Sequence, residues 1–188
     1  MNHSEHLSKQ YDSDLEDVRS RVLQMGGLVE AQILAAIDCF TTGDHDKVSQ
    51  VEEEFRVNAY GVEIDGMCVH VVAKRQPAAR DLRLIMGVSK AVTDLERMGD
   101  EAEKIARMAK LIHQGERISL PRFSEVKYMA DLVLDMLRKA LDGFARLDAT
   151  KAVEIARQDQ SVDEEFRLNL RHLITYMMED PRTISVFI

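Results

Sequence analysis

Several residue types are scarce in this chain, and their scarcity narrows the structural classes open to it. The 188 residues contain no tryptophan, three prolines, two cysteines and only 5% aromatic residues. Because proline is expelled from helix interiors, its restriction to positions 77, 121 and 181 permits long helices. Cys39 and Cys68 form no CxxC motif, so we expect both thiols to be reduced, as in a cytoplasmic protein.

Positive charge and long apolar runs are also in short supply. The chain has 25 Lys and Arg residues against 33 Asp and Glu residues, a formal net charge of −8. No basic block stands out, which argues against nucleic-acid binding. No apolar run reaches the ~20 residues of a membrane span. The N-terminal residues lack the apolar core of a signal peptide.

What the chain does contain is helical periodicity. Apolar residues recur every three or four positions and predict six helical segments. Five are complete, at about 13–43, 46–75, 79–113, 122–146 and 149–178, and the sixth, from about 184, is expected to be cut short. Ser13 and Glu16 have the spacing of a capping box, which predicts that the first helix begins there. Pro77 and Pro181 are expected to end the second and fifth helices. No strand pattern is evident.

The second half of the chain repeats the first. Met25 aligns with Met129, Asp38 with Asp142, Asp44 with Asp148, and Pro77 with Pro181. A shared helical period does not by itself bring aspartates and prolines into register, so we interpret the match as a duplication. The sequence therefore predicts an all-α fold of two similar three-helix bundles, 10–113 and 122–188. The second bundle is expected to lack its last helix in this chain.

The segment DLERMGDEAEKIA, residues 94–106, reads as helix despite a central glycine. Glu96 and Asp100 are one turn apart, so their like charges repel slightly, and Gly99 costs about 1 kcal/mol relative to Ala. A cation between the carboxylates would offset the repulsion. The glycine would allow a metal or a neighbouring helix to approach the backbone.

Two further pairs recur at the same spacing. Glu54 and Asn58 lie in the second predicted helix, and Asp159 and Asp163 lie in the fifth. If the second and third helices pack antiparallel, two pairs could face each other across a groove. Oxygen ligands suit Mg, Ca, Mn or Fe rather than a structural zinc site. The alternative is that these acids form an ordinary solvated face of an acidic helical protein.

The segment AKRQPAARDLRLIM, residues 73–86, is locally basic and falls at a helix–helix turn. Arg75, Arg80 and Arg83, with Asp81, are candidates for contact with an acidic partner or a phosphate. The alternative is that Asp81 complements the dipole of the following helix and that the arginines are solvated.

Enzyme motifs are missing from the sequence. It has no Glu-x-x-His pair of the kind that holds di-iron centres, no Gly-x-Ser-x-Gly elbow and no phosphate loop. We therefore predict a protein that is not an enzyme and acts through protein contacts. Two alternatives are a carboxylate-rich metal-binding protein with an enzymatic or storage role, and a purely structural helical scaffold.

Four stretches together resemble the PhoU family of bacterial phosphate-transport regulators. They are MGGLVEAQ at 25–32, AKRQPAARDLRLIM at 73–86, DLERMGDEAEKIA at 94–106 and ITYMMEDPRTI at 174–184. The resemblance implies two three-helix bundles and no catalysis. Some members bind divalent ions or multinuclear clusters (Mg, Mn, Fe or Zn) through paired acids. The matching positions here are Glu54, Asn58, Glu96, Asp100, Asp159 and Asp163, with Asn58 departing from the acidic pattern.

The resemblance also implies partners. Family members are cytoplasmic negative regulators that link the ATPase of the phosphate ABC transporter to a membrane sensor histidine kinase. They restrain uptake and phosphate-regulon signalling when phosphate is plentiful. The resemblance implies a homodimer that is peripheral to the membrane through its partners and does not bind nucleic acid.

Overall fold

The chain is helical throughout the part that the structure describes. This computed structural model describes residues 3–43, 54–114, 123–179 and 181, and within those ranges it contains no strand. Its helices are α1 (His3–Thr42), α3 (Glu54–Arg75), α4 (Ala79–Gln114), α5 (Phe123–Arg146) and α6 (Lys151–Glu179). The all-α prediction is confirmed. The helices predicted at 79–113, 122–146 and 149–178 agree closely with α4, α5 and α6. Residues 46–53 of the second predicted helix lie outside the described ranges.

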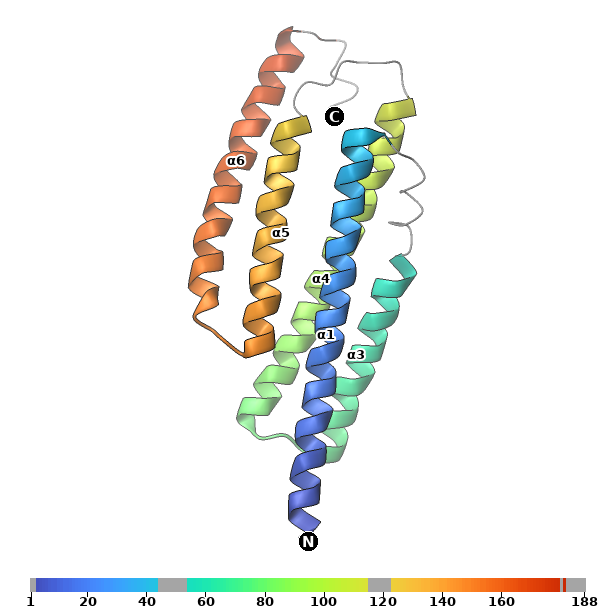
Figure 1. The fold of residues 1–188 in the computed structure, drawn as a ribbon, viewed down its shortest axis with the longest axis vertical. Helices are drawn as coiled ribbons and strands as arrows, with labels where there is room; N and C mark the ends of the chain where they lie inside the picture. Colours follow the sequence, from blue (N-terminus) through green and yellow to red (C-terminus); the bar gives the residue numbers. More distant parts are fainter. Residues whose placement is uncertain (1–2, 44–53, 115–122, 180, 182–188) are drawn as a thin grey trace.

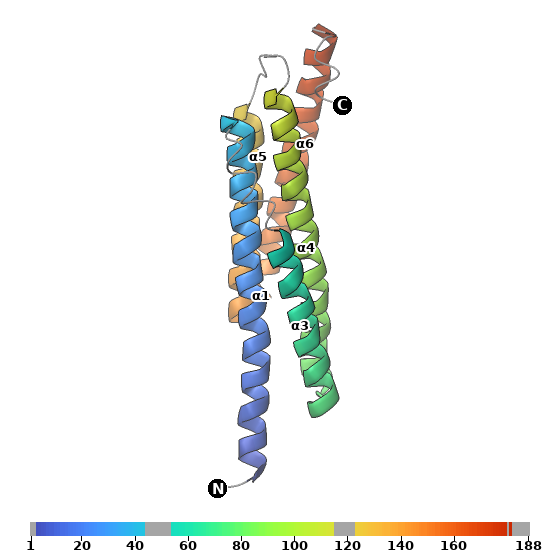
Figure 2. The same ribbon diagram turned by 90° about the vertical axis from the view of Figure 1, so that its right-hand side faces the viewer.

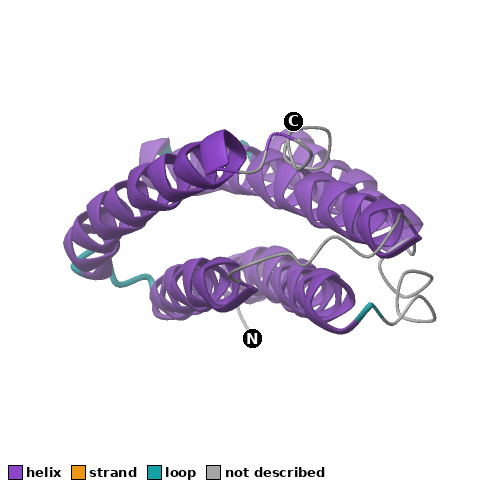
Figure 3. Ribbon diagram, turned by 90° about the horizontal axis from the view of Figure 1, so that it is seen from above, coloured by secondary structure: helices purple, strands orange, loops and turns teal. Residues whose placement is uncertain are grey.

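The helices run side by side along the length of the molecule (Figure 1). α1 packs against α3, α4 and α5, while α3 packs against α4 and α5 packs against α6. In Figure 2, α1 and α5 lie on one side and α3, α4 and α6 on the other, and Figure 3 shows these two rows end-on. α1 therefore joins the α3–α4 hairpin to the α5–α6 hairpin.

One apolar core fills the space between α1, α3 and α4. Its members recur at helical spacing on all three helices, and the most deeply buried are Val18, Val22, Met25, Val29, Val57, Ile64, Val71, Val88 and Val92. The apolar spacing predicts a core stripe in the first helix at Leu15, Val18, Val22, Met25, Val29, Ile33, Ala36, Ile37 and Phe40. In the third helix it predicts Leu84, Val88, Val92, Leu95, Met98, Ala102, Ile105 and Ala109. Most of these residues are buried or partly buried, but Ile85 is buried rather than Leu84, and Ile105 is 37% exposed while Ala106 is fully buried. Small residues suit this end of the bundle because Ala36, Ala102 and Ala106 pack together.

Helix α1 is also long and apolar enough, by length and composition, to cross a membrane over Lys9–Thr42. Among the described residues it is the one helix that meets this criterion. In the structure it is the central helix of the bundle and buries its apolar face against three others. A buried core helix and a membrane span pass this test equally, so the absence of a span stays a prediction.

The predicted helix start at Ser13 is wrong. α1 begins at His3 and continues through Ser13 without interruption. Glu16 does not reach back to close a capping box, because its carboxylate pairs with Arg19. Long-range contacts hold the extra turns in place: the Tyr11 hydroxyl donates to Asp81 Oδ2 at 2.9 Å. The Arg75 guanidinium donates to Asp14 Oδ2 through Nε at 3.1 Å and Nη2 at 3.0 Å.

The ends of the helices are closed by specific caps. Gly43 has a φ of +72° and donates its N–H to the Cys39 carbonyl at 2.9 Å, as expected at a helix C-terminus. His113, near the end of α4, donates from Nε2 to the Phe40 carbonyl at 3.0 Å. α3 ends at Arg75, two residues before Pro77, which confirms the predicted stop.

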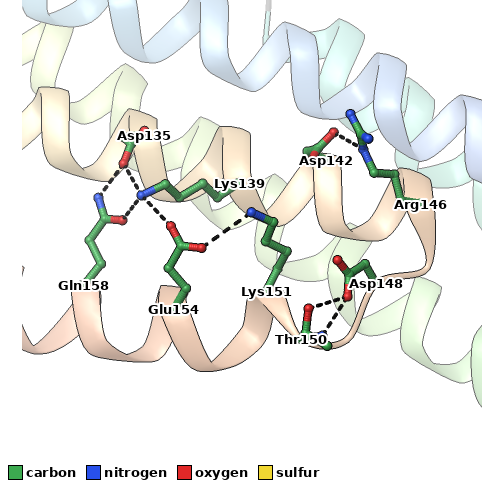
Figure 4. Close-up of polar contacts among 9 residues, drawn as sticks. All are labelled: Asp135, Lys139, Asp142, Arg146, Asp148, Thr150, Lys151, Glu154 and Gln158. Carbon is green, nitrogen blue, oxygen red and sulfur yellow. Dashed lines mark hydrogen bonds and ion pairs between the residues drawn. The ribbon is translucent and has the colours of Figure 1, made fainter.

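A polar network joins α5 to α6 (Figure 4). Lys139 Nζ lies 2.8 Å from Asp135 Oδ2, 2.9 Å from Gln158 Oε1 and 3.2 Å from Glu154 Oε1. Gln158 Nε2 donates to Asp135 Oδ2 at 2.8 Å and to the Leu132 carbonyl at 3.2 Å. These contacts tie α5 to α6 through partly exposed charged and amide side chains.

The two halves meet along α1 and α5. Gly26 leaves space for Leu141, since a Cβ on Gly26 would lie 2.5 Å from Leu141 Cδ2. Beside this contact, Arg138 Nη2 lies 2.7 Å from Glu30 Oε1. A close backbone approach and an ion pair together fix α5 against α1.

Candidate functional site

Glu96 lies on the side of α4 that faces α3. Its carboxylate rests against Gly61 of α3, where a side chain on residue 61 would collide with Oε1. Val92, one turn earlier on α4, would lie 3.4 Å from a Cβ placed on residue 61. Gly61 therefore gives Glu96 a place on the flank of the core rather than on the solvated face of the helix.

The environment of Glu96 disfavours its charged form. Burial raises the pKa of the Glu96 carboxyl, and the negative charges of Asp65 and Asp100 raise it further. Asp65 is on α3 and Asp100 is one turn along α4, so acids converge on Glu96 from two helices. A cation at this position would be attracted by all three groups.

Gly99 of α4 lies close to both α1 and α3. A Cβ on Gly99 would lie 3.0 Å from Gln32 Oε1 of α1 and 3.7 Å from Val57 Cγ1 of α3. Gln32 is itself buried. The central glycine of residues 94–106 is thus explained by the approach of neighbouring helices, which is one of the two reasons that the sequence suggested.

The predicted pairing of acids across a groove stays a prediction, but the register of α3 and α4 can be compared with it. Gly61 beside Glu96 and Val57 beside Gly99 set an antiparallel register, which brings Asn58 level with Met98 and Gly99. Along the helix axis, Asn58 therefore lies between the levels of Glu96 and Asp100. Its side chain is exposed. Glu54 begins α3, but its side chain lies outside the described part of the chain.

The third predicted pair has a different setting. Asp159 and Asp163 of α6 are both exposed, and Asp163 Oδ2 pairs at 3.7 Å with Arg167 on the same helix. Across the described ranges, no three His, Cys, Asp or Glu side chains gather closely enough to hold a metal ion. The described groove residues thus supply paired carboxylates but not a full ligand set, and metal binding stays a prediction.

The residues predicted for partner contact are used differently. Arg75 and Asp81 are partly buried and bind Asp14 and Tyr11 of α1. Burial, followed by the hydrogen bond to Asp81, raises the pKa of Tyr11 to about 12. Arg80 and Arg83 are exposed. The turn between α3 and α4 therefore secures α1 and leaves only part of its charge for a partner.

Sequence reasoning missed Gly61 and Asp65. Both lie in α3 and are separated by one helical turn, so they face the same neighbour. On a helical wheel of α3, Gly61 and Asp65 lie beside the buried positions Val57, Ile64 and Cys68. The apolar spacing of this helix could therefore have predicted that both residues lie next to a neighbouring helix.

Comparison with known proteins settles the family. The sequence model described as the PhoU domain matches residues 22–109 and again 126–187. The chain belongs to the PhoU family. The two matched segments confirm that the domain is repeated. The predicted boundaries at 10–113 and 122–188 stay predictions.

The PhoU relatives carry one consistent name. A Pseudomonas putida protein is 49% identical over 183 residues, covering 96% of this chain and 70% of the relative; it is a phosphate-specific transport system accessory protein PhoU homolog. The Escherichia coli K12 accessory protein PhoU is 42% identical, with 98% and 76% covered. The crystal structure of PhoU from Pseudomonas aeruginosa superposes with a TM-score of 0.87 at 47% identity, covering 94% of this chain and 84% of that one.

Proposed function

We propose that this PhoU-family chain is a cytoplasmic accessory protein that regulates phosphate-specific transport and acts through protein contacts rather than catalysis. The observation that carries the proposal is the match to similarly named relatives over nearly the whole chain, at 49% and 42% identity. The fold supports it, because the bundle offers long helical surfaces suited to contact with other proteins. Within the described ranges, acids and cations are spread along the helices rather than gathered around an enclosed nucleophile.

The finer proposal concerns partners. This chain would bind the ATPase of the phosphate ABC transporter and a sensor histidine kinase, and restrain both when phosphate is plentiful. The exposed side of the α3–α4 groove supports such a role because it combines acids, cations and apolar side chains on a rigid hairpin. A homodimer is a further part of this proposal.

We also infer that the groove binds a metal ion through Glu96 and Asp100, with Asn58 and Glu54 opposite. The convergence of Glu96, Asp65 and Asp100 supports this, because their mutual repulsion would be relieved by a divalent cation. Carboxylate and amide oxygens suit Mg or Mn, and a multinuclear Fe or Zn site would need further ligands.

The experiment that tests the function is complementation. A strain that lacks its own family member would receive the wild-type gene or Glu96→Ala/Asp100→Ala, and we would measure labelled phosphate uptake and a phosphate-repressed reporter. Asp94→Ala/Glu101→Ala, which removes two exposed acids from the same helix, is the matched control. We expect the wild type and the control to restore repression. Failure of the wild type would refute the proposed regulatory role.

Metal content is measured separately on purified protein by elemental analysis without added chelator. We expect metal in the wild type and the control, and loss in Glu96→Ala/Asp100→Ala. Equal metal content in all three proteins would show that the metal does not bind through Glu96 and Asp100. Normal repression by a metal-free variant would separate metal binding from regulation.

A further inference from the structure

The outward side of the α3–α4 hairpin carries apolar side chains that the bundle leaves uncovered. On α3, Val62 is 75% exposed, Val69 68% and Val72 40%. On α4, Leu82 is 40% exposed and Met86 57%. We call these five residues the hairpin patch. Exposed aliphatic groups of this number amount to a few hundred Å², on the order of the largest patch of a typical monomer, and such patches are often functional.

The patch belongs to one end of the hairpin. The antiparallel register set by Gly61 beside Glu96, continued toward the turn, brings Val72 level with Ile85 and Val69 level with Val88. Leu82 and Met86 lie within one turn of those two positions on α4. Exposed apolar side chains of both helices therefore lie near the turn at Gln76 and Pro77.

Helix α3 is consequently apolar on two opposite sides. Val57, Ile64 and Val71 point into the core and are almost fully buried. Val62 and Val69 lie on the outward side, where a surface helix is usually polar. Packing in the core explains why Val57, Ile64 and Val71 are apolar. It does not explain why Val62 and Val69 are apolar.

Cations surround the patch in an otherwise acidic chain. Lys74, Arg80, Arg83 and Lys90 are all exposed, and in the described part of the molecule none of the four forms an ion pair. Arg83 and Lys90 lie on the same side of α4 as Met86, one turn before and after it. One acid interrupts the patch: Asp65 is exposed and lies on α3 between Val62 and Val69, about one turn from each. The cations beside the patch are therefore those of α4.

We propose that the hairpin patch is a docking surface for an acidic amphipathic helix of a partner protein. Exposed apolar side chains on two neighbouring helices can pack against the apolar face of a third helix, and acids along that helix would meet Arg83 and Lys90. The proposal deepens the proposed function, since it rests on this chain acting through partner proteins.

Charge decides against two other occupants. An anionic membrane attracts the local cations but repels a chain of net charge −8. A second copy would bring its own cations as well as Asp65 to the patch. A short acidic helix brings only groups that Arg83 and Lys90 attract, so its charge matches the local cations better than either alternative.

The test is a titration followed by methyl NMR on the whole chain. The probe is a designed helical peptide with leucines along one face and glutamates beside them; the control peptide carries lysines in place of the glutamates. We expect the methyl signals of Val62, Val69 and Met86 to shift with the glutamate peptide. Val153 and Met178 of α6, which are 58% and 79% exposed, should not shift. The lysine peptide should bind at least about ten-fold more weakly.

Charge-reversal variants test the surface directly. Arg83→Glu/Lys90→Glu changes only exposed side chains and should weaken binding of the glutamate peptide by about ten-fold. Lys110→Glu/Arg157→Glu makes the same change in net charge elsewhere and should leave binding unaltered. Equal effects of the two variants would overturn the proposal, because binding would then follow net charge alone.

Other results of the titration would contradict the binding of an acidic helix to the hairpin patch. Equal binding of both peptides, or shifts at Val153 and Met178, would refute a specific acidic ligand. Patch shifts that grow with protein concentration alone would identify a second copy instead. Shifts caused by phosphatidylglycerol vesicles but not by the peptide would identify a membrane surface. Failure of the wild type to restore phosphate repression in cells counts against the proposed function only, since peptide binding is measured on the purified chain.

Discussion

The carboxylate of Glu96 on α4 lies directly against the backbone of α3 at Gly61. The absence of a side chain on Gly61 is what lets Glu96 sit at the edge of the core and face Asp65. One small residue on one helix thereby determines the electrostatics of an acid on another.

Gly61→Ala is expected to displace the Glu96 carboxylate while keeping the fold. The added methyl would collide with a flexible carboxylate end, and the helix gains up to about 1 kcal/mol in propensity. We therefore expect a change in unfolding free energy below about 1 kcal/mol, together with reduced metal content. Gly66→Ala is the control, since a Cβ added at residue 66 would meet nothing within 4 Å. Chemical denaturation and elemental analysis provide the measurements; unchanged metal content in Gly61→Ala would contradict the prediction.

Glu96→Gln is expected to stabilise the metal-free protein at neutral pH. The pKa of Glu96 in the folded state lies above its ordinary value of 4.5, so between these two pKa values the folded state binds more protons than the unfolded state. The free energy of unfolding therefore falls as pH rises through that range. The loss of stability remains at higher pH. We expect a gain of less than about 1 kcal/mol at pH 7 that disappears below about pH 4. Urea unfolding with chelator at both pH values measures it, with Asp94→Asn as the control. A gain at pH 7 that persists at low pH would contradict this assignment.

Arg75→Ala is expected to loosen the N-terminal turns of α1. It removes two hydrogen bonds to the partly buried Asp14, so we expect a loss of about 1–2 kcal/mol in unfolding free energy at pH 7. Hydrogen bonding from Gln10 and then from Arg75 lowers the pKa of Asp14 below 3.8. The contribution is present above that value and is lost as pH falls through the lowered pKa.

A double-mutant cycle with Asp14→Ala measures the coupling between Arg75 and Asp14, and hydrogen exchange locates the loss in α1. Arg83→Ala, which alters an exposed arginine of the same turn, should cost less than about 0.5 kcal/mol. A coupling energy near zero would show that the ion pair does not hold the N-terminal turns.

The sequence was a sufficient guide to most of the helices, because apolar spacing and prolines act locally. It failed at Ser13 because the contacts that extend α1, from Tyr11 to Asp81 and from Asp14 to Arg75, join segments far apart in the chain. A capping motif is a local preference, and such long-range contacts override it.

In the candidate site, too, the sequence predicted the local features but not the contacts between helices. Spacing placed Glu96 and Asp100 on one face of a helix without any knowledge of the fold. It did not show that Arg75 and Asp81 bind α1, nor that Gly61 and Asp65 face Glu96 from another helix. Those facts depend on the antiparallel register of α3 and α4, which only the packed bundle determines.

Asn169→Leu is expected to stabilise the α5–α6 hairpin. Asn169 is 9% exposed, and within the described chain its Nδ2 atom has no hydrogen-bond acceptor. Replacing this unsatisfied group with an apolar one should add about 1 kcal/mol to the unfolding free energy. Thermal and urea unfolding measure the change. Asn58→Leu, an exposed asparagine on the equivalent helix, is the control and should give no such gain. A loss of stability in Asn169→Leu would show that the amide is satisfied.

The uninterrupted course of α1 has a mechanical consequence. Its 40 residues form a rod of roughly 60 Å at 1.5 Å per residue. One end of that rod is tied to the α3–α4 turn by Asp14 and Tyr11, and further along it carries α5 through Gly26 and Glu30. Because α1 is continuous between these two points, a displacement of the hairpin turn would be passed along the helix to α5 and the other half of the molecule.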